Sequence, residues 1–105
     1  MRQDGGAALT VAVRLATALR THAAGQASIE LEVATPATLR TVLDALAEAH
    51  PSVGRRVRDE SGALRRHVNI FVGADNAKDL AGLDTPVPDG AEVSVLAAVS
   101  GGADR

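Results

Sequence analysis

Two neighbouring segments of this chain alternate regularly between apolar and polar residues, and this pattern restricts the fold more than any other feature. Residues 9–15 place Leu, Val, Val and Leu at every second position, and residues 29–33 do the same with Ile, Leu and Val. A period of two is that of a β-strand with one buried face. The loop between the two runs has Gly25 as its expected turn residue, so the sequence predicts an antiparallel hairpin.

The hydrophobic period then changes to that of a helix. One apolar stripe is formed by Leu39, Val42, Leu43, Leu46 and Ala47, spaced as on one face of an α-helix. Thr38 is expected to cap the start of this helix. Pro51 is expected to end it, because a proline disfavours helical geometry in the residue before it.

The remaining chain supplies two more predicted strands, at residues 67–72 and 92–99, with a turn at 73–76. Residues 52–66 are expected to be irregular and basic. The order strand, strand, helix, strand, strand predicts an α+β fold in which one main helix crosses one face of a mixed sheet. This is the pattern of the β-grasp, or ubiquitin-like, fold. Its expected core is Leu9, Val11, Val13, Ile29, Leu31, Val33, Leu39, Val42, Leu43, Leu46, Val68, Ile70, Val93 and Val95.

The length and the net charge of the chain limit how many domains it can form and which partners it can bind. At 105 residues the chain has the size of one domain, which we place at residues 8–99 between a flexible leader (1–7) and a flexible C-terminal tail (100–105). Thirteen acidic residues against eleven Lys and Arg give a net charge of −2, which argues against a nucleic-acid partner. No apolar run reaches the roughly 18–20 residues that span a membrane, and no signal peptide is evident. We expect a cytoplasmic protein.

The residue types needed for catalysis or metal binding are scarce. The chain has no cysteine, which excludes a thiol nucleophile and a thiolate metal site. His22, His50 and His67 lack metal-ligand spacing, and no serine lies in a nucleophile motif. We therefore expect no catalytic residue, no metal site and no bound cofactor, and a protein that is not itself an enzyme.

Two features suggest contacts with a partner. Alternation along the last two predicted strands places Phe71 and Leu96 on the sheet face away from the helix, where exposed apolar groups suggest a docking patch. The alternative is that Phe71 folds over a sheet edge and packs locally. A second feature is the arginine cluster, which is either a solvated loop or a dock for an acidic partner surface. It comprises Arg55, Arg56, Arg58, Arg65 and Arg66.

The residues after the last predicted strand are the most informative. Ser100 is followed by Gly101 and Gly102, and then only by Ala103, Asp104 and Arg105. Two consecutive glycines lack Cβ atoms, so this segment can extend and enter a narrow channel. A glycine carboxylate is also the least hindered acyl group that a chain can present to an activating enzyme.

With these pieces in place, the chain over residues 9–102 resembles the ThiS/MoaD family of ubiquitin-like sulfur carriers. The matching motifs are the helix start Thr38-Leu39, the strand at 67–72, the turn Pro88-Asp89-Gly90 and the ending at 95–102. The stretch 66–72 and the Gly-Gly ending are most similar to the CysO-type carriers of cysteine biosynthesis. One departure is Ala97, which stands where many members have proline.

The resemblance implies a function for the glycine pair. In such carriers an E1-like enzyme adenylates the terminal glycine with ATP, and a sulfide or persulfide source converts it to a thiocarboxylate that a partner synthase uses. Gly102 would take this role here, with Ser100 and Gly101 as a flexible approach. The three residues after Gly102 block its carboxyl group, so the chain is similar to pro-forms that a JAMM-type zinc protease trims.

A second class of function stays open at this point. A ubiquitin-like modifier that is conjugated to lysines needs the same free glycine and the same adenylate, and a docking domain could act through the Phe71 face alone. The sulfur acceptor is open as well: cysteine, a molybdopterin precursor, thiamin or a specialised metabolite.

Overall fold

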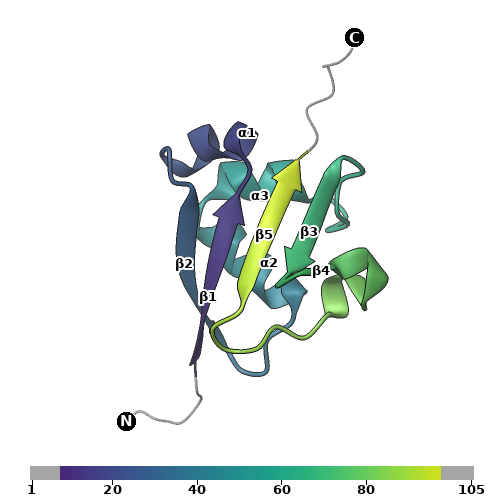
Figure 1. Ribbon diagram of the computed structural model, residues 1–105. Coiled ribbons are helices and arrows are strands. Elements are labelled where there is room, and N and C mark those ends of the chain that lie inside the picture. The colour runs from purple at the N-terminus through teal and green to yellow at the C-terminus, as the bar shows by residue number, and fades with distance from the viewer. Residues whose placement is uncertain (1–7, 98–105) are drawn as a thin grey trace.

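The computed structural model describes residues 8–97, which form a five-stranded mixed sheet with helices on one face (Figure 1). The strands lie in the order β2-β1-β5-β3-β4. The two central strands, β1 and β5, run parallel, and the other neighbours are antiparallel. The predicted leader, the tail from Ser100 and the last two residues of the final predicted strand lie outside the described residues. The strand bounds are Ala8–Leu15 (β1), Ser28–Ala34 (β2), Val68–Val72 (β3), Asp75–Asn76 (β4) and Glu92–Ala97 (β5).

The predicted hairpin is confirmed. β1 and β2 pair antiparallel, with Val11 opposite Leu31 and Val13 opposite Ile29. Along both strands every second side chain is buried, because the pleat turns successive residues to opposite faces. Gly25 closes the connection with φ of +82°, a left-handed conformation that glycine adopts without steric cost.

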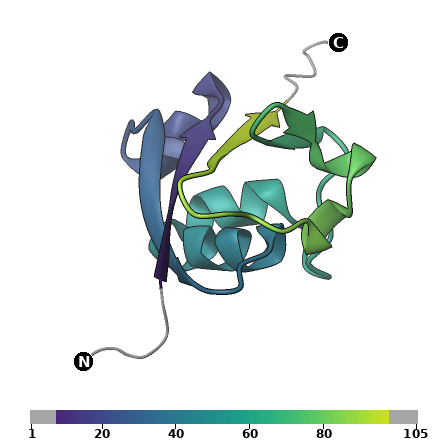
Figure 2. The same cartoon turned by 60° about the horizontal axis from the view of Figure 1, so that its bottom comes forward.

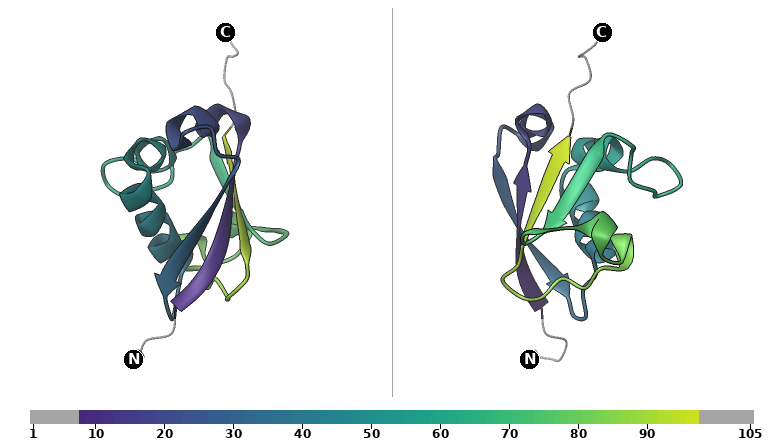
Figure 3. Two further views of the ribbon diagram at one scale, coloured as in Figure 1. Left: turned by 90° about the vertical axis from the view of Figure 1, so that its left-hand side faces the viewer. Right: turned by 45° about the vertical axis from the view of Figure 1, so that its right-hand side comes forward.

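The predicted main helix is α2, which spans Leu39–Ala49 and covers the inner face of the sheet (Figure 3). Thr38 caps its start as expected: the Thr38 hydroxyl accepts from the Thr41 backbone N–H (3.4 Å), and the Thr41 hydroxyl accepts from the Thr38 N–H (2.8 Å). This reciprocal arrangement satisfies two N–H groups that have no partner within the helix. The apolar stripe of α2 faces the sheet, with Leu39, Val42, Leu43 and Leu46 buried.

The prediction that residues 52–66 are irregular is wrong for its first half. Pro51 ends α2 and also begins a second helix, α3, at Pro51–Val57, since proline suits the first turn of a helix, where its missing N–H is not needed. Val53 and Val57 of α3 are buried in the core. Gly54 lets α3 approach α2 closely: a Cβ at this position would lie 2.6 Å from the Cβ of Ala47.

Two further short elements differ from the prediction. The expected loop after β1 contains the helix α1 (Thr17–Arg20) and a 3₁₀ turn, η1 (Thr21–Ala23), which bury Leu19 and Ala23. The expected turn at 73–76 contains β4, which pairs with the end of β3. Two 3₁₀ turns, η2 (Ala77–Asp79) and η3 (Gly82–Asp84), then lead toward β5 (Figure 2).

The core between sheet and helices is aliphatic, as expected from the composition. Every residue predicted for it is buried. The elements that the sequence did not predict add further members: Leu19, Ala23, Val53 and Val57. The sheet, α2 and α3 therefore enclose one continuous core, and the side chains at the end of β5 pack on it.

Replacement of Ile70 by Ala tests this core. Ile70 is 1% exposed, and loss of a large buried side chain leaves a cavity that costs about 2–5 kcal/mol. Leu96→Ala is the matched control on the neighbouring strand, because Leu96 is 45% exposed and should cost no more than about 0.5 kcal/mol. Urea unfolding measures both. Equal losses for the two variants would contradict the assigned core.

Candidate functional site

The region of interest is the end of the sheet where β5 finishes. β1 and β5 run parallel, so their carboxyl ends lie at the same end of the molecule, beside α1 (Figure 1). The last described residue is Ala97, and Gly102 follows five residues later in the sequence. The predicted site residues Ser100, Gly101, Gly102, Ala103, Asp104 and Arg105 lie outside the described residues, so the structure places the base of this segment only.

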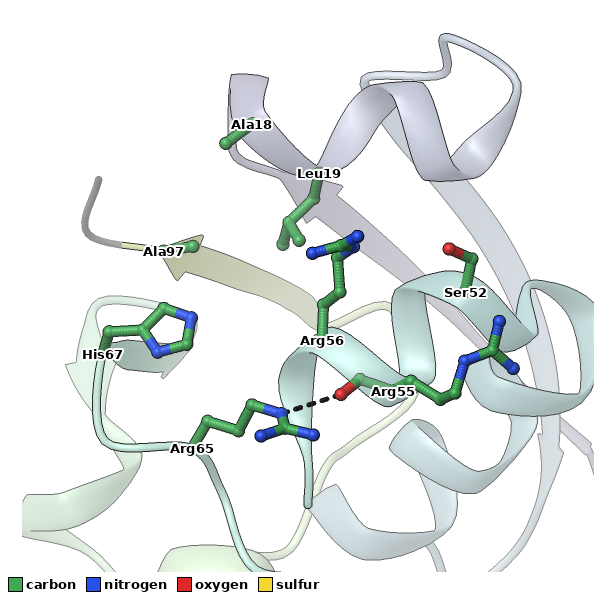
Figure 4. A pocket seen from close by; sticks show the side chains of 8 residues that line it. All are labelled: Ala18, Leu19, Ser52, Arg55, Arg56, Arg65, His67 and Ala97. Carbon is green, nitrogen blue, oxygen red and sulfur yellow. Dashed lines mark hydrogen bonds between the residues drawn. The ribbon is translucent and has the colours of Figure 1, made fainter. Parts of the chain in front are cut away.

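A pocket of about 480 Å³ opens beside Ala97 (Figure 4). Four separate parts of the chain form it: α1, α3, the segment before β3, and the end of β5. We call it the basic pocket, because three arginines and a histidine contribute to its wall. Its lining residues are Ala18, Leu19, Ser52, Arg55, Arg56, Arg65, His67 and Ala97.

The arginines of the basic pocket form no salt bridge within residues 8–97, although the Asp59 carboxylate is near enough for the charge of Arg65 to act on it. No carboxylate of this part of the chain forms a salt bridge with Arg55, Arg56 or Arg65, whereas Arg58 pairs with Asp44 at 2.9 Å. Arg65 is held in place, since its Nε donates a hydrogen bond of 2.8 Å to the carbonyl oxygen of Arg55 (Figure 4). The sequence identified these arginines as a cluster but not the pocket, which depends on tertiary contacts.

A hydroxyl–imidazole pair lies next to the basic pocket. The Ser52 hydroxyl and His22 Nδ1 are 2.8 Å apart, which ties α3 to the 3₁₀ turn after α1. Among the described residues, no carboxylate hydrogen-bonds to the other ring nitrogen of His22. The pair therefore lacks the third member of a hydrolase triad, and its role is to hold the two walls of the pocket together.

The turn before Arg65 is stabilised by Asp59. One carboxylate oxygen accepts hydrogen bonds from the Ser61 hydroxyl (2.6 Å) and from the backbone N–H groups of Ser61 (2.9 Å) and Ala63 (3.2 Å). The Ser61 hydroxyl is the main cause that lowers the pKa of Asp59 below its ordinary 3.8, and the charge of Arg65 acts in the same direction. The negative charge of Asp59 is thus engaged in its own turn.

Phe71 and Leu96 lie on the outer face of the sheet. Phe71 pairs with Ser94, and Leu96 pairs with Asn69, so the two apolar side chains are diagonal neighbours on the same face. Leu96 is 45% exposed and Phe71 is half-buried. Phe71 also pairs with Asn76 of β4, so its backbone lies between two strands of the sheet, and the role of this patch in docking stays a prediction.

The described part of the chain has neither a metal-binding cluster of side chains nor a helix suited to cross a membrane. Residues 8–97 contain no cluster of three or more His, Asp or Glu that could hold a metal ion. Within the same range, no helix has the length and apolar character needed to cross a membrane. His22 lies in η1, His50 lies between α2 and α3, and His67 directly precedes β3.

The hairpin, the helical crossover and the parallel central strands define a ubiquitin-like β-grasp protein. The family model named ThiS matches residues 13–102, a range that ends at the second glycine of the Gly101-Gly102 pair. The chain belongs to the ThiS family, and the predicted fold and family are confirmed.

Relatives within this group include both carriers and modifiers. The sulfur carrier protein CysO of Mycobacterium tuberculosis is 36% identical over 96 residues, which cover 90% of this chain and all of CysO. The small archaeal modifier protein 1 of Haloferax volcanii is 33% identical over 75% of this chain and 86% of its own. Among solved structures, the BexX/CysO complex of Amycolatopsis orientalis matches with a TM-score of 0.75 and 32% identity, covering 86% of this chain and 97% of the matched one.

Replacement of Ser61 by Ala tests the electrostatics beside the basic pocket. Loss of the Ser61 hydroxyl should raise the pKa of Asp59 toward its ordinary value, while the two backbone hydrogen bonds keep part of the shift. Because the folded pKa is lowered, this turn is stabilised at neutral pH and weakens as the pH falls through the folded pKa. An NMR titration of the Asp59 carboxyl group measures the change, with Ser94→Ala as control. An unchanged titration in Ser61→Ala would contradict the assigned cause.

Proposed function

We propose that this protein is a sulfur carrier that bears its sulfur on the carboxyl group of Gly102. The observation that carries the proposal is the match to the ThiS family, which runs to Gly102, together with 36% identity over the full length of a sulfur carrier protein. The chain has no cysteine, and the proposed chemistry needs none, because the sulfur is held by a backbone carboxyl carbon.

The proposed reaction has two steps, both catalysed by a partner enzyme. A carboxylate oxygen of Gly102 attacks the α-phosphate of ATP, and pyrophosphate leaves to give an acyl-adenylate. Sulfide then attacks the carbonyl carbon and AMP leaves, which produces a thiocarboxylate. When a persulfide supplies the sulfur, the same attack gives an acyl disulfide, and a second thiol must cleave its S–S bond to release the thiocarboxylate and a disulfide. Glycine suits this chemistry because it has no side chain to hinder the approach to the carboxyl carbon.

The carrier works with three proteins and is not itself the catalyst. A JAMM-type metalloprotease removes Ala103, Asp104 and Arg105, an E1-like enzyme activates Gly102, and a synthase receives the sulfur. Ser100 and Gly101 connect Gly102 to the domain and enter these active sites with it. The relationship to CysO favours cysteine, or another sulfur-containing metabolite, as the product, and we place the carrier in the cytoplasm, with ATP at hand. In support of such partnerships, the CysO of Amycolatopsis orientalis occurs in a complex with another protein, BexX.

A second candidate is a ubiquitin-like modifier. The small archaeal modifier protein 1, at 33% identity, favours it. A modifier shares the Gly102 adenylate with the carrier but ends as an amide on a lysine, so the two functions differ in the acceptor only. The activation step is common to both, and the product of the second step separates them.

Removal of Ala103, Asp104 and Arg105 should make Gly102 reactive toward the E1-like enzyme. In the intact chain the Gly102 carbonyl is part of the amide bond to Ala103, so it has no free carboxylate to attack ATP. We expect a chain ending at Gly102 to gain one sulfur in place of one oxygen when it is incubated with the E1-like enzyme, ATP and sulfide. The full-length chain should gain none, because the Arg105 side chain does not fit a channel shaped for two glycines. Intact-mass spectrometry measures both.

The control for this experiment is a chain ending at Gly101, which has a free glycine carboxylate but is one residue short. It should react far more slowly than the chain ending at Gly102. Thiocarboxylate on the uncleaved chain would overturn the need for cleavage. Failure of the chain ending at Gly102 to react with sulfide, with amide formation on lysine instead, would replace the carrier function by the modifier function.

The outer sheet face is the proposed docking patch for the E1-like enzyme or the synthase. Phe71→Ala removes the larger apolar group of the Phe71–Leu96 pair and should weaken partner binding by about tenfold, with little change in melting temperature. Leu80→Ala is the matched control, because Leu80 is 48% exposed but lies outside the sheet. Calorimetric titration and thermal unfolding give the two readouts. A loss of stability with unchanged binding would make Phe71 a packing residue.

A further inference from the structure

We propose that the basic pocket is the docking site for an acidic, carboxylate-bearing segment of the enzyme that activates Gly102. The proposal rests on the proposed function, and it assigns to the carrier a second contact surface in addition to the outer sheet face. Three features support it: arginines that form no salt bridge within residues 8–97, position beside the base of the C-terminal segment, and an apolar wall next to the charged groups.

The positive charge of the pocket favours a negatively charged partner. Arg55, Arg56 and Arg65 have no salt-bridge partner among residues 8–97, although the protein as a whole carries a net charge of −2. By contrast, three other arginines of this part of the chain form salt bridges: Arg14 with Glu92, Arg40 with Asp84 and Arg58 with Asp44. The basic pocket is therefore a local positive surface on an acidic protein.

The pocket lies at the base of the segment that carries Gly102, where the activating enzyme must approach the domain. Ala97 is both the last described residue and part of the pocket wall. Gly102 follows five positions later in the sequence, and a fully extended chain covers at most about 3.6 Å per residue, or about 18 Å over this step. An active site that encloses Gly102 must therefore bring its entrance close to the pocket.

The chemistry of the pocket favours carboxylates of a protein over the phosphates of a bound nucleotide. Guanidinium groups form paired hydrogen bonds with carboxylates and with phosphates alike. The feature that favours a carboxylate segment is the apolar wall of Ala18 and Leu19, which suits the aliphatic part of a glutamate side chain. The pocket has no Phe, Tyr or Trp on which a base could stack.

A peptide titration tests the pocket without the enzyme. Hexaglutamate, added to the ¹⁵N-labelled full-length chain at low salt, should shift the amide signals of Arg55, Arg65 and His67. The shifts should disappear in the double variant Arg55→Glu/Arg56→Glu and at high salt, where surface charges are screened. The matched control, Arg40→Glu/Lys78→Glu, changes the net charge equally at a different site and should keep them. Shifts centred elsewhere, or kept in the pocket variant, would overturn the proposal. So would equal shifts from inorganic pyrophosphate, which would make the pocket a phosphate site.

Enzyme kinetics separate this proposal from the proposed function. With chains ending at Gly102 and the E1-like enzyme, the pocket variant should raise the KM for the carrier by about tenfold and leave kcat within about twofold. The control variant should change neither. An unchanged KM with normal adenylation of the parent chain would overturn the pocket proposal alone. Absence of adenylation of the parent chain would overturn the proposed function, and the peptide titration would then decide the pocket by itself.

Discussion

The structure depends on the parallel pairing of β1 with β5. This pairing joins the N-terminal hairpin to the C-terminal half of the chain, with Val13 opposite Val93 and Leu15 opposite Val95. Its four central side chains are all buried. Because parallel strands cannot be joined by a tight turn, the chain between them must cross over. That intervening chain includes β2 and β3, and the helices α2 and α3 that connect them close the core beneath β1 and β5.

One consequence of this pairing is that the end of β5 lies beside α1 and α3, elements that are distant in sequence. The close contact of Gly54 with Ala47 and the hydrogen bond of Ser52 with His22 hold α3 in this position. The rigid β-grasp core thus places two different surfaces near the start of the C-terminal segment: the apolar outer face around Phe71 and the basic pocket. Under the proposed function, the partner that acts on Gly102 contacts both surfaces, one through apolar burial and one through charge.

Most of the fold could be predicted because long periodic segments dominate it. The alternation at 9–15 has four buried apolar residues and that at 29–33 has three, and the stripe of α2 has four together with a complete cap. α3 was missed because it has only two buried residues, Val53 and Val57, and a glycine in its middle, so its local signal is weak. β4 has two residues, too few to show a period. The glycine pair is visible in the local sequence, and its role stays a prediction. The basic pocket could not be predicted, because its residues come from four separate segments.

The most direct test of the account is the intact mass of the protein purified from the cells that make it. The account predicts a species that ends at Gly102 and is heavier than the plain carboxylate by the difference between one sulfur and one oxygen atom. This species should lose the extra mass when alkaline hydrolysis releases the sulfur. Recovery only of the chain that continues through Arg105, or of Gly102 only as an amide on lysines of other proteins, would contradict the sulfur-carrier function.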